Sequence, residues 1–258
     1  MKNIESKPYK LIIAYDGTAY HGWQEQAGHP TIAGTLQDSF AKVFGEPIKV
    51  VGASRTDTGV HALGQVARFY TSRTLSSERL RTSWNGALSN DIHIRSVEPI
   101  IDKGDERIFH PQHNVAQKTY YYHFSARRPL PHWARFVYFY PQKFDEQKLR
   151  DGLNCFVGTH NFKSFCAESW RYEDTVCTID AIELTYLRHL GIYRVTIRGP
   201  RFLHNMIRRM VGTALKVASY DDLSVADVQQ ALSKPGVYTY VQTAPAHGLV
   251  LRKIEYKS

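Results

Sequence analysis

The polar residues best suited to chemistry lie in one short segment, Ser54-Arg55-Thr56-Asp57-Thr58-Gly59-Val60-His61. An apolar stretch precedes the segment, and its glycine permits a tight turn. Arg55 lies two residues before Asp57, so its guanidinium can form a charge-assisted bond that keeps the carboxylate ionised and oriented. A nucleophile or general base requires such a carboxylate. The segment therefore predicts either a catalytic loop or, as the simpler alternative, a turn that Asp57 caps with its own side chain.

The triplet Asp57-Thr58-Gly59 also occurs in aspartic proteases, where two carboxylates share one proton. This chain has no second Asp-Thr-Gly triplet, so a dimer would have to supply it. Arg55 would moreover keep Asp57 charged, and the basic segments described below have no use in a protease. We therefore disfavour the protease interpretation.

The elements expected to position this loop mix strands and helices without a regular βαβ period. Thr31 is the expected N-cap of a helix that stops at Gly45, and a second helix should begin near Ser76. Later helices are expected from Asp145 to Val157, from His204 to about Ala218 and near residues 225–232. Strands are expected at residues 9–15, 48–51, 65–71, 92–97, 119–125, 136–140, 176–187, 193–198 and 249–256. This pattern favours an α+β fold in which helices cover one face of mixed or antiparallel sheets.

The length of 258 residues suits one large domain or two small ones. The polar stretch at residues 102–107 is the best linker candidate. We therefore expect an N-terminal half at residues 1–104 with the Asp57 loop, and a C-terminal half at residues 105–258.

The positive charge is concentrated in two segments of the C-terminal half. The chain carries 33 Lys and Arg against 24 Asp and Glu, a net charge of +9. Residues 107–144 contain six basic and no acidic residues, and residues 184–220 contain seven basic and no acidic ones. The first segment also holds 11 of the 32 aromatic residues. Basic groups neutralise phosphates and rings stack on unpaired bases, which favours a nucleic-acid partner over a solvated face around core strands.

Composition excludes several other classes. Hydrophobic residues make up 43% and charged residues 22%, as in a packed globular protein. No apolar run is long enough to span a membrane, and the first residues lack the apolar core of an export signal. The three cysteines fit neither a disulfide framework nor a metal knuckle, and His110 and His113 have no partners at metal spacing. We expect a cytoplasmic protein without a metal site.

Five ordered segments resemble the bacterial tRNA pseudouridine synthase A family. The resemblance spans nearly the whole chain, and its core is Ala53–Ala62 followed by Gly64-Gln65-Val66. The other segments are Tyr15-Asp16-Gly17-Thr18 with His21-Gly22-Trp23-Gln24; Phe109-His110 with Lys118-Thr119-Tyr120-Tyr121-Tyr122; Phe202 to Gly212 (FLHNMIRRMVG); and Gly248-Leu249 with Leu251 and Tyr256. One departure is Ser54, where the family usually has glycine, so the loop must adopt a φ that a Cβ accepts.

The resemblance implies conversion of uridine to pseudouridine in the anticodon stem-loop of tRNA, at positions 38, 39 and 40. It assigns catalytic roles to Asp57, Arg55, Tyr120 and Arg208. Asp57 would act on the sugar as nucleophile or base, and Arg55 would fill the space that the flipped base leaves. Tyr120 would stack on the uracil, and Arg208 would pair with Asp57. Candidate substrate-binding residues are Tyr120, Arg127, Arg128, Arg201 and Arg209.

The resemblance further implies two RRM-like halves with an active-site cleft between them. It implies a homodimer that binds tRNA and needs no cofactor. Tyr120 could instead be a core residue of its strand, and Arg208 could lie on the solvent face of its helix. The rival function is a non-catalytic RNA-binding protein with RRM-like sheets, which would have no use for an oriented carboxylate at Asp57.

Overall fold

A computed structural model describes residues 6–101, 109–113, 115–236 and 238–257. The chain divides into two compact units: unit 1 comprises residues 1–116 with 251–258, and unit 2 comprises residues 117–250. The expected linker at 102–107 and the expected division between 104 and 105 lie outside the described residues. Over the described ranges, every helix is too short or too polar to cross a membrane.

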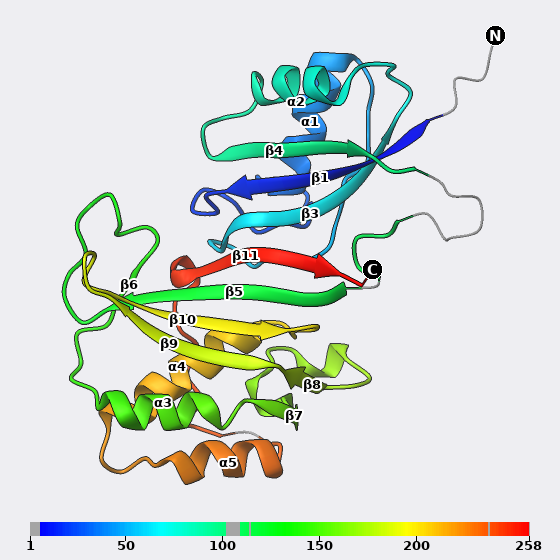
Figure 1. Cartoon of the computed structure of the whole chain (residues 1–258). Coiled ribbons are helices and arrows are strands. Elements are labelled where there is room, and N and C mark those ends of the chain that lie inside the picture. Colours follow the sequence, from blue (N-terminus) through cyan, green and yellow to red (C-terminus); the bar gives the residue numbers. More distant parts are fainter. Residues whose placement is uncertain (1–5, 102–108, 114, 237, 258) are drawn as a thin grey trace. The chain divides into compact units, whose positions relative to one another are not determined.

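Unit 1 is built on a sheet with the strand order β4-β1-β3-β11 (Figure 1). The central strand β1 (Lys7–Tyr15) pairs antiparallel with β3 (His61–Thr71) on one side and β4 (Ile92–Pro99) on the other. The short strand β2 (Val51–Gly52) also pairs with β3, and β11 spans Leu249–Tyr256. The segment that follows β2 is thereby held beside the start of β3.

Two helices cover one face of this sheet, because residues from both contact the same strand residue. Helix α1 (Ile32–Phe44) carries Phe40, and helix α2 (Ser77–Asn85) carries Trp84. Both rings meet Phe69 of β3 edge-on, with ring centroids 5.5 and 5.2 Å away. All three side chains are fully buried. This aromatic cluster forms the centre of the unit 1 core.

The ends of α1 confirm the prediction from its capping residues. Thr31 is the N-cap, and its side chain accepts a hydrogen bond from the Gly34 N–H. Gly45 ends the helix in the left-handed conformation with φ 65°, which glycine adopts without steric cost.

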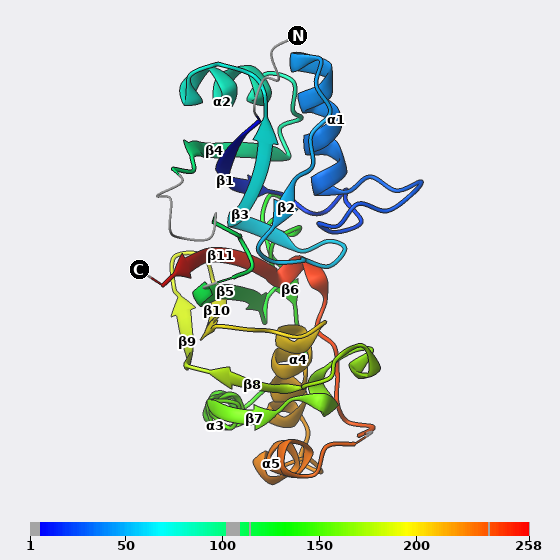
Figure 2. The same cartoon turned by 90° about the vertical axis from the view of Figure 1, so that its right-hand side faces the viewer.

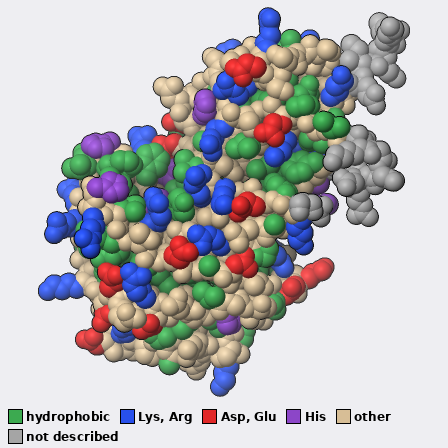
Figure 3. Space-filling view, viewed as in Figure 1, with side chains coloured by type: hydrophobic (Ala, Val, Ile, Leu, Met, Phe, Trp, Pro, Cys, Tyr) green, Lys and Arg blue, Asp and Glu red, His purple; other side chains and the backbone are tan. Residues whose placement is uncertain are grey.

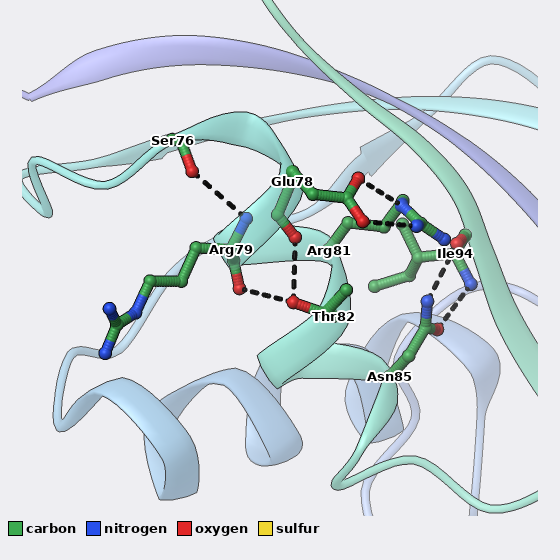
Figure 4. A network of polar contacts seen from close by, with 7 residues as sticks. All are labelled: Ser76, Glu78, Arg79, Arg81, Thr82, Asn85 and Ile94. Carbon is green, nitrogen blue, oxygen red and sulfur yellow. Dashed lines mark hydrogen bonds and ion pairs between the residues drawn. The ribbon is translucent and has the colours of Figure 1, made fainter.

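Helix α2 is fastened to β4 by one amide side chain (Figure 4). The amide of Asn85 donates to the Ile94 carbonyl oxygen at 2.9 Å and accepts from the Ile94 N–H at 2.8 Å. Other contacts on the helix are local: Ser76 caps the first turn, and Arg81 forms a two-bond ion pair with Glu78. The indole N–H of Trp84 instead donates to Ser39 of α1 at 2.9 Å.

Unit 2 contains a sheet with the order β5-β10-β9. Strand β10 (Ile192–Gly199) pairs antiparallel with β5 (Val115–Ser125) and β9 (Ala181–Leu187). Two-residue β6 (Tyr138–Phe139) runs parallel to the end of β5. A separate hairpin joins β7 (Gly158–Asn161) and β8 (Val176–Ile179).

Three helices complete unit 2: α3 (Glu146–Asn154), α4 (Met206–Ser219) and α5 (Val225–Ser233); Figure 2 shows α3 and α5 nearly end-on. Helix α4 is the most buried of them. Gly152 of α3 lies against Ala214 of α4, where an added Cβ would be 3.7 Å from the alanine Cβ. Tyr140 donates to the Leu215 carbonyl oxygen, which connects α4 to the segment after β6.

The observed elements agree with a mixed α and β architecture, and five helices occur among the described residues. Four expectations were wrong in detail. The strand expected at 136–140 covers only Tyr138–Phe139. Residues 48–50 form no strand, residues 176–187 form two strands interrupted at Asp180, and α3 ends before Phe156. Strand β7 was not anticipated, because its residues Gly158-Thr159-His160-Asn161 carry no apolar alternation.

Replacing Asn85 with Ala should lower the free energy of unfolding by about 1–3 kcal/mol, because both backbone groups of Ile94 lose their partner. Thr82→Ala is the matched control on the same helix, since the Thr82 hydroxyl bonds only to carbonyls of its own helix. Urea denaturation of both variants measures the difference. Equal effects would contradict a specific role for Asn85 in holding α2 to β4.

Candidate active site

The Asp57 loop connects β2 to β3 in unit 1, and a side chain continues the strand pairing into it. The Ala53 N–H still bonds to the Val66 carbonyl oxygen at 2.8 Å. At the next residue the side-chain amide of Gln65 replaces the strand as the bonding partner. It accepts from the Ser54 N–H at 3.2 Å and donates to the Ser54 carbonyl oxygen at 2.6 Å. Gln65 is completely buried. Its amide therefore satisfies the backbone of the loop where the strand ends.

Thr56, immediately before Asp57, is fixed through two of its groups. Its hydroxyl lies 2.7 Å from the hydroxyl of Tyr15, the last residue of β1. Its carbonyl oxygen accepts the Trp23 N–H at 3.0 Å. Thr56 and Trp23 are both buried. The position of the Asp57 backbone thus depends on two segments that come much earlier in the chain.

Those earlier segments approach the loop so closely that two positions require glycine. A Cβ on Gly22, which has φ +81°, would lie 2.5 Å from the Thr56 carbonyl oxygen. A Cβ on Gly17 would lie 2.0 Å from the Val60 carbonyl oxygen. Within the loop, the Val60 N–H bonds to the Asp57 carbonyl oxygen and closes a turn through Gly59 at φ +76°. The loop is therefore rigid, with Asp57 at its partly exposed tip.

Ser54 confirms the expectation about backbone geometry. Among the described residues other than glycine, φ is positive at Glu168 and Asn205, so Ser54 has a φ that side chains readily adopt. The other expectation for this loop is not met. Arg55 is exposed, and no hydrogen bond or ion pair to another described residue holds its guanidinium. Buried groups around Thr56, rather than Arg55, fix the loop.

The second group of predicted residues lies in unit 2. Tyr120 is on β5 opposite Ile197 of β10, and only 5% of it is exposed. Its ring meets that of Phe202 edge-on at 5.2 Å. Phe202 precedes α4, whose first turn carries Arg208. Residues 202–205 thus border both predicted residues.

Arg208 is half-buried and bonded within unit 2. Its Nε donates to the Ala244 carbonyl oxygen at 2.8 Å, and its Nη1 donates to Oδ1 of Asn205 at 2.6 Å. Its charge lowers the pKa of His247, adding to the larger effect of burial. The same charge opposes the burial that raises the pKa of Tyr122. Arg208 is therefore a half-buried cation that is hydrogen-bonded within the unit, rather than a helix residue that only faces solvent.

The remaining predicted arginines differ in exposure. Arg127 and Arg128 are exposed in the segment between β5 and β6, which also presents Leu130 and Trp133. Figure 3 shows basic, histidine and hydrophobic side chains gathered in that region. Arg201 is exposed and donates to the Asp174 carbonyl oxygen at 2.8 Å. Arg209 instead donates to the Cys166 carbonyl oxygen at 2.8 Å, so its guanidinium is engaged inside the unit.

Sequence reasoning assigned no role to several residues of these two groups. Gln65 and Tyr15 belong to the motifs quoted above. A polar group inside an apolar strand was the signal that could have identified each of them. Lys118 precedes Tyr120 by two residues and shares its face of β5, because side chains alternate along a strand. Burial lowers the pKa of Lys118 to about 8. No three His, Cys, Asp or Glu side chains in the described ranges converge as metal ligands would.

Chemically, unit 1 presents one carboxylate on a rigid loop beside an exposed guanidinium. Unit 2 presents an aromatic ring and a cation anchored around the start of α4. A carboxylate with fixed direction can attack an electrophilic carbon or accept a proton, and a buried ring can stack on a base.

Comparison with known proteins shows which family this chain is related to. The model of the tRNA pseudouridine synthase family matches residues 11–102 and 153–257. The tRNA pseudouridine synthase A of Thermodesulfovibrio yellowstonii is 34% identical over 257 residues, covering 96% of this chain and 98% of that protein. The enzymes of the same name from Clostridium kluyveri and Acetivibrio thermocellus are 34% and 33% identical, and each comparison covers 99% of this chain and 100% of the relative. The loop of Asp57 and the helix of Arg208 both lie within the matched ranges, and this chain belongs to the tRNA pseudouridine synthase A family.

Proposed function

We propose that this enzyme isomerises uridine to pseudouridine at positions 38, 39 and 40 of the tRNA anticodon stem-loop, with Asp57 as its catalytic carboxylate. In this reaction the bond between N1 and C1′ breaks and a bond between C5 and C1′ forms. The proton lost from C5 is balanced by the one gained at N1, so no other reactant is consumed. The observation that carries the proposal is the rigid loop that fixes the Asp57 backbone, in a chain related to these enzymes over its full length.

The other residues have complementary roles in this proposal. Arg55, exposed on the same loop, enters the RNA stack and fills the space of the flipped uridine. Tyr120 stacks on the uracil, and Arg208 pairs with Asp57. Whether Asp57 attacks the sugar or removes a proton from it stays open. Arg127, Arg128 and Arg201 contact phosphates, and Arg209 supports the same surface from within.

The larger assembly follows from the same resemblance. We propose that the two halves are RRM-like, that the uridine enters a cleft between them, and that the enzyme acts in the cytoplasm as a homodimer. The wide basic segments suit recognition of tRNA by shape and backbone rather than by sequence.

Asp57→Asn should reduce pseudouridine formation by about a thousandfold or more, because the neutral amide can neither attack nor accept a proton. Affinity for tRNA should stay within about threefold of wild type. Single-nucleotide mapping of pseudouridine and a tRNA binding titration measure the two effects, with the exposed Asp222→Asn as charge-matched control. Full activity of Asp57→Asn would rule out the catalytic assignment, and equal loss of binding would favour the non-catalytic RNA-binding function.

Gly22→Ala should lower the turnover rate more than tenfold, because the new methyl group displaces Thr56 and with it Asp57. We expect unfolding free energy to fall by about 1–3 kcal/mol. Gly28→Ala is the matched control: Gly28 has nearly the same φ, +77°, but open space around its Cβ position. Similar losses of turnover in both variants would mean that backbone strain, rather than contact with the loop, matters.

The double variant Arg127→Gln with Arg128→Gln should weaken tRNA binding and flatten its dependence on salt. Each lost phosphate contact reduces the slope of log K against log salt by roughly one. The control removes two exposed charges of α1 and α2, Lys42 and Arg79. An unchanged slope in the Arg127 and Arg128 variant would exclude both from the RNA contact.

A further inference from the structure

Asn205 adopts an unusual backbone conformation at the start of α4. It is the N-cap residue, with φ 59° and ψ 4° in the left-handed region. Apart from glycines, the only other described residue with positive φ is Glu168. Asparagine tolerates this region better than most residues, yet it remains less favourable than the ordinary helical or extended conformations. Such strain persists only where the surroundings enforce it.

The side chain of Asn205 does not perform the usual task of an N-cap. An N-cap asparagine normally accepts the backbone N–H two or three residues later, and this bond stabilises the helix. Asn205 makes no such bond. Its Oδ1 accepts instead from Nη1 of Arg208, the residue three positions later, at 2.6 Å. The acceptor that would cap the helix is thus used to hold a guanidinium.

A second hydrogen bond, made by the Nε atom, also fixes the direction of the Arg208 guanidinium. Nε of Arg208 donates to the Ala244 carbonyl oxygen at 2.8 Å, while the Ala244 N–H donates to the Arg208 carbonyl oxygen at 3.0 Å. The guanidinium is therefore fixed at Nε by residue 244 and at Nη1 by Asn205. Removal of the Asn205 acceptor would take away one of these two directed bonds.

The neighbouring segment holds Asn205 in place. His204 accepts the Ala167 N–H at its carbonyl oxygen and donates its own N–H to the Tyr172 hydroxyl. Its ring Nδ1 lies 3.1 Å from Oε2 of Glu168, the other residue with positive φ. The two hydrogen bonds at its backbone fix His204, the residue before Asn205, and thereby enforce the conformation of Asn205.

We propose that Asn205 is a positioning residue that orients the guanidinium of Arg208 for the isomerisation. The inference rests on the proposed function of Arg208 at the active site. Asn205 itself does not touch the reacting atoms. Its left-handed conformation and its missing cap are the structural cost of directing Oδ1 at the guanidinium.

The test compares Asn205→Gly with Asn205→Asp. Glycine relieves the backbone but also removes a partner of the Arg208 charge; because these effects oppose each other, the midpoint of thermal unfolding should stay close to that of wild type. Its kcat for pseudouridine formation should nevertheless fall about tenfold or more, with KM for tRNA within about twofold. Aspartate keeps an acceptor at the same place and should restore kcat to within about threefold of wild type.

Two further variants separate positioning from a general effect of the loop. In an Arg208→Lys background, Asn205→Gly should cause almost no additional loss, because the pair acts as a unit. Glu168→Gly relieves the other left-handed residue and removes a carboxylate that contacts His204 rather than Arg208, so its kcat should stay within about threefold of wild type. Wild-type kcat in Asn205→Gly, failure of Asn205→Asp to restore kcat, equal loss in Glu168→Gly, or full additivity with Arg208→Lys would each overturn the proposal. An inactive wild-type protein would instead refute the proposed function.

Discussion

The position of Asp57 depends on the residue before it, which is anchored through both its side chain and its backbone. Thr56 shares a hydrogen bond with Tyr15 and accepts another from the Trp23 N–H. These partners come from the end of β1 and from the segment that leads into α1, so the strand and this segment together set the loop backbone. A side chain carried on a preset backbone needs less reorganisation, and preorganised groups accelerate chemistry.

In unit 2 hydrogen bonds to the guanidinium itself hold the charged side chain of Arg208. Arg208 is a cation removed from full solvent contact, and burial of a charge is costly unless hydrogen bonds compensate. Asn205 and Ala244 supply those bonds, and the helix gives up an N-cap in exchange. Both units thus have locally costly features, tight glycine contacts in one and a left-handed asparagine in the other, next to the side chains proposed to act on the uridine.

Local sequence signals predicted much of the fold. Thr31 and Gly45 marked the ends of α1, because capping chemistry depends only on neighbouring residues. Strand β7 lacks such a signal, since its polar residues are held by pairing with β8. For the site, residue types suggested Asp57, and the resemblance to the family suggested Arg208. The roles of Gln65 and Asn205 could not be predicted, because each depends on a contact whose geometry the sequence leaves undefined. For Arg55 the sequence suggested a contact that is absent: its spacing of two residues from Asp57 predicted a bond that the structure does not form.

The central claim is that one rigidly held carboxylate converts uridine to pseudouridine in the tRNA anticodon stem-loop. The most direct measurement incubates unmodified tRNA transcripts with the purified protein alone and maps pseudouridine at every uridine. We expect pseudouridine at positions 38, 39 and 40 without any added cofactor. Its absence from all three positions, with the protein folded and bound to the tRNA, would show that the protein does not catalyse this isomerisation.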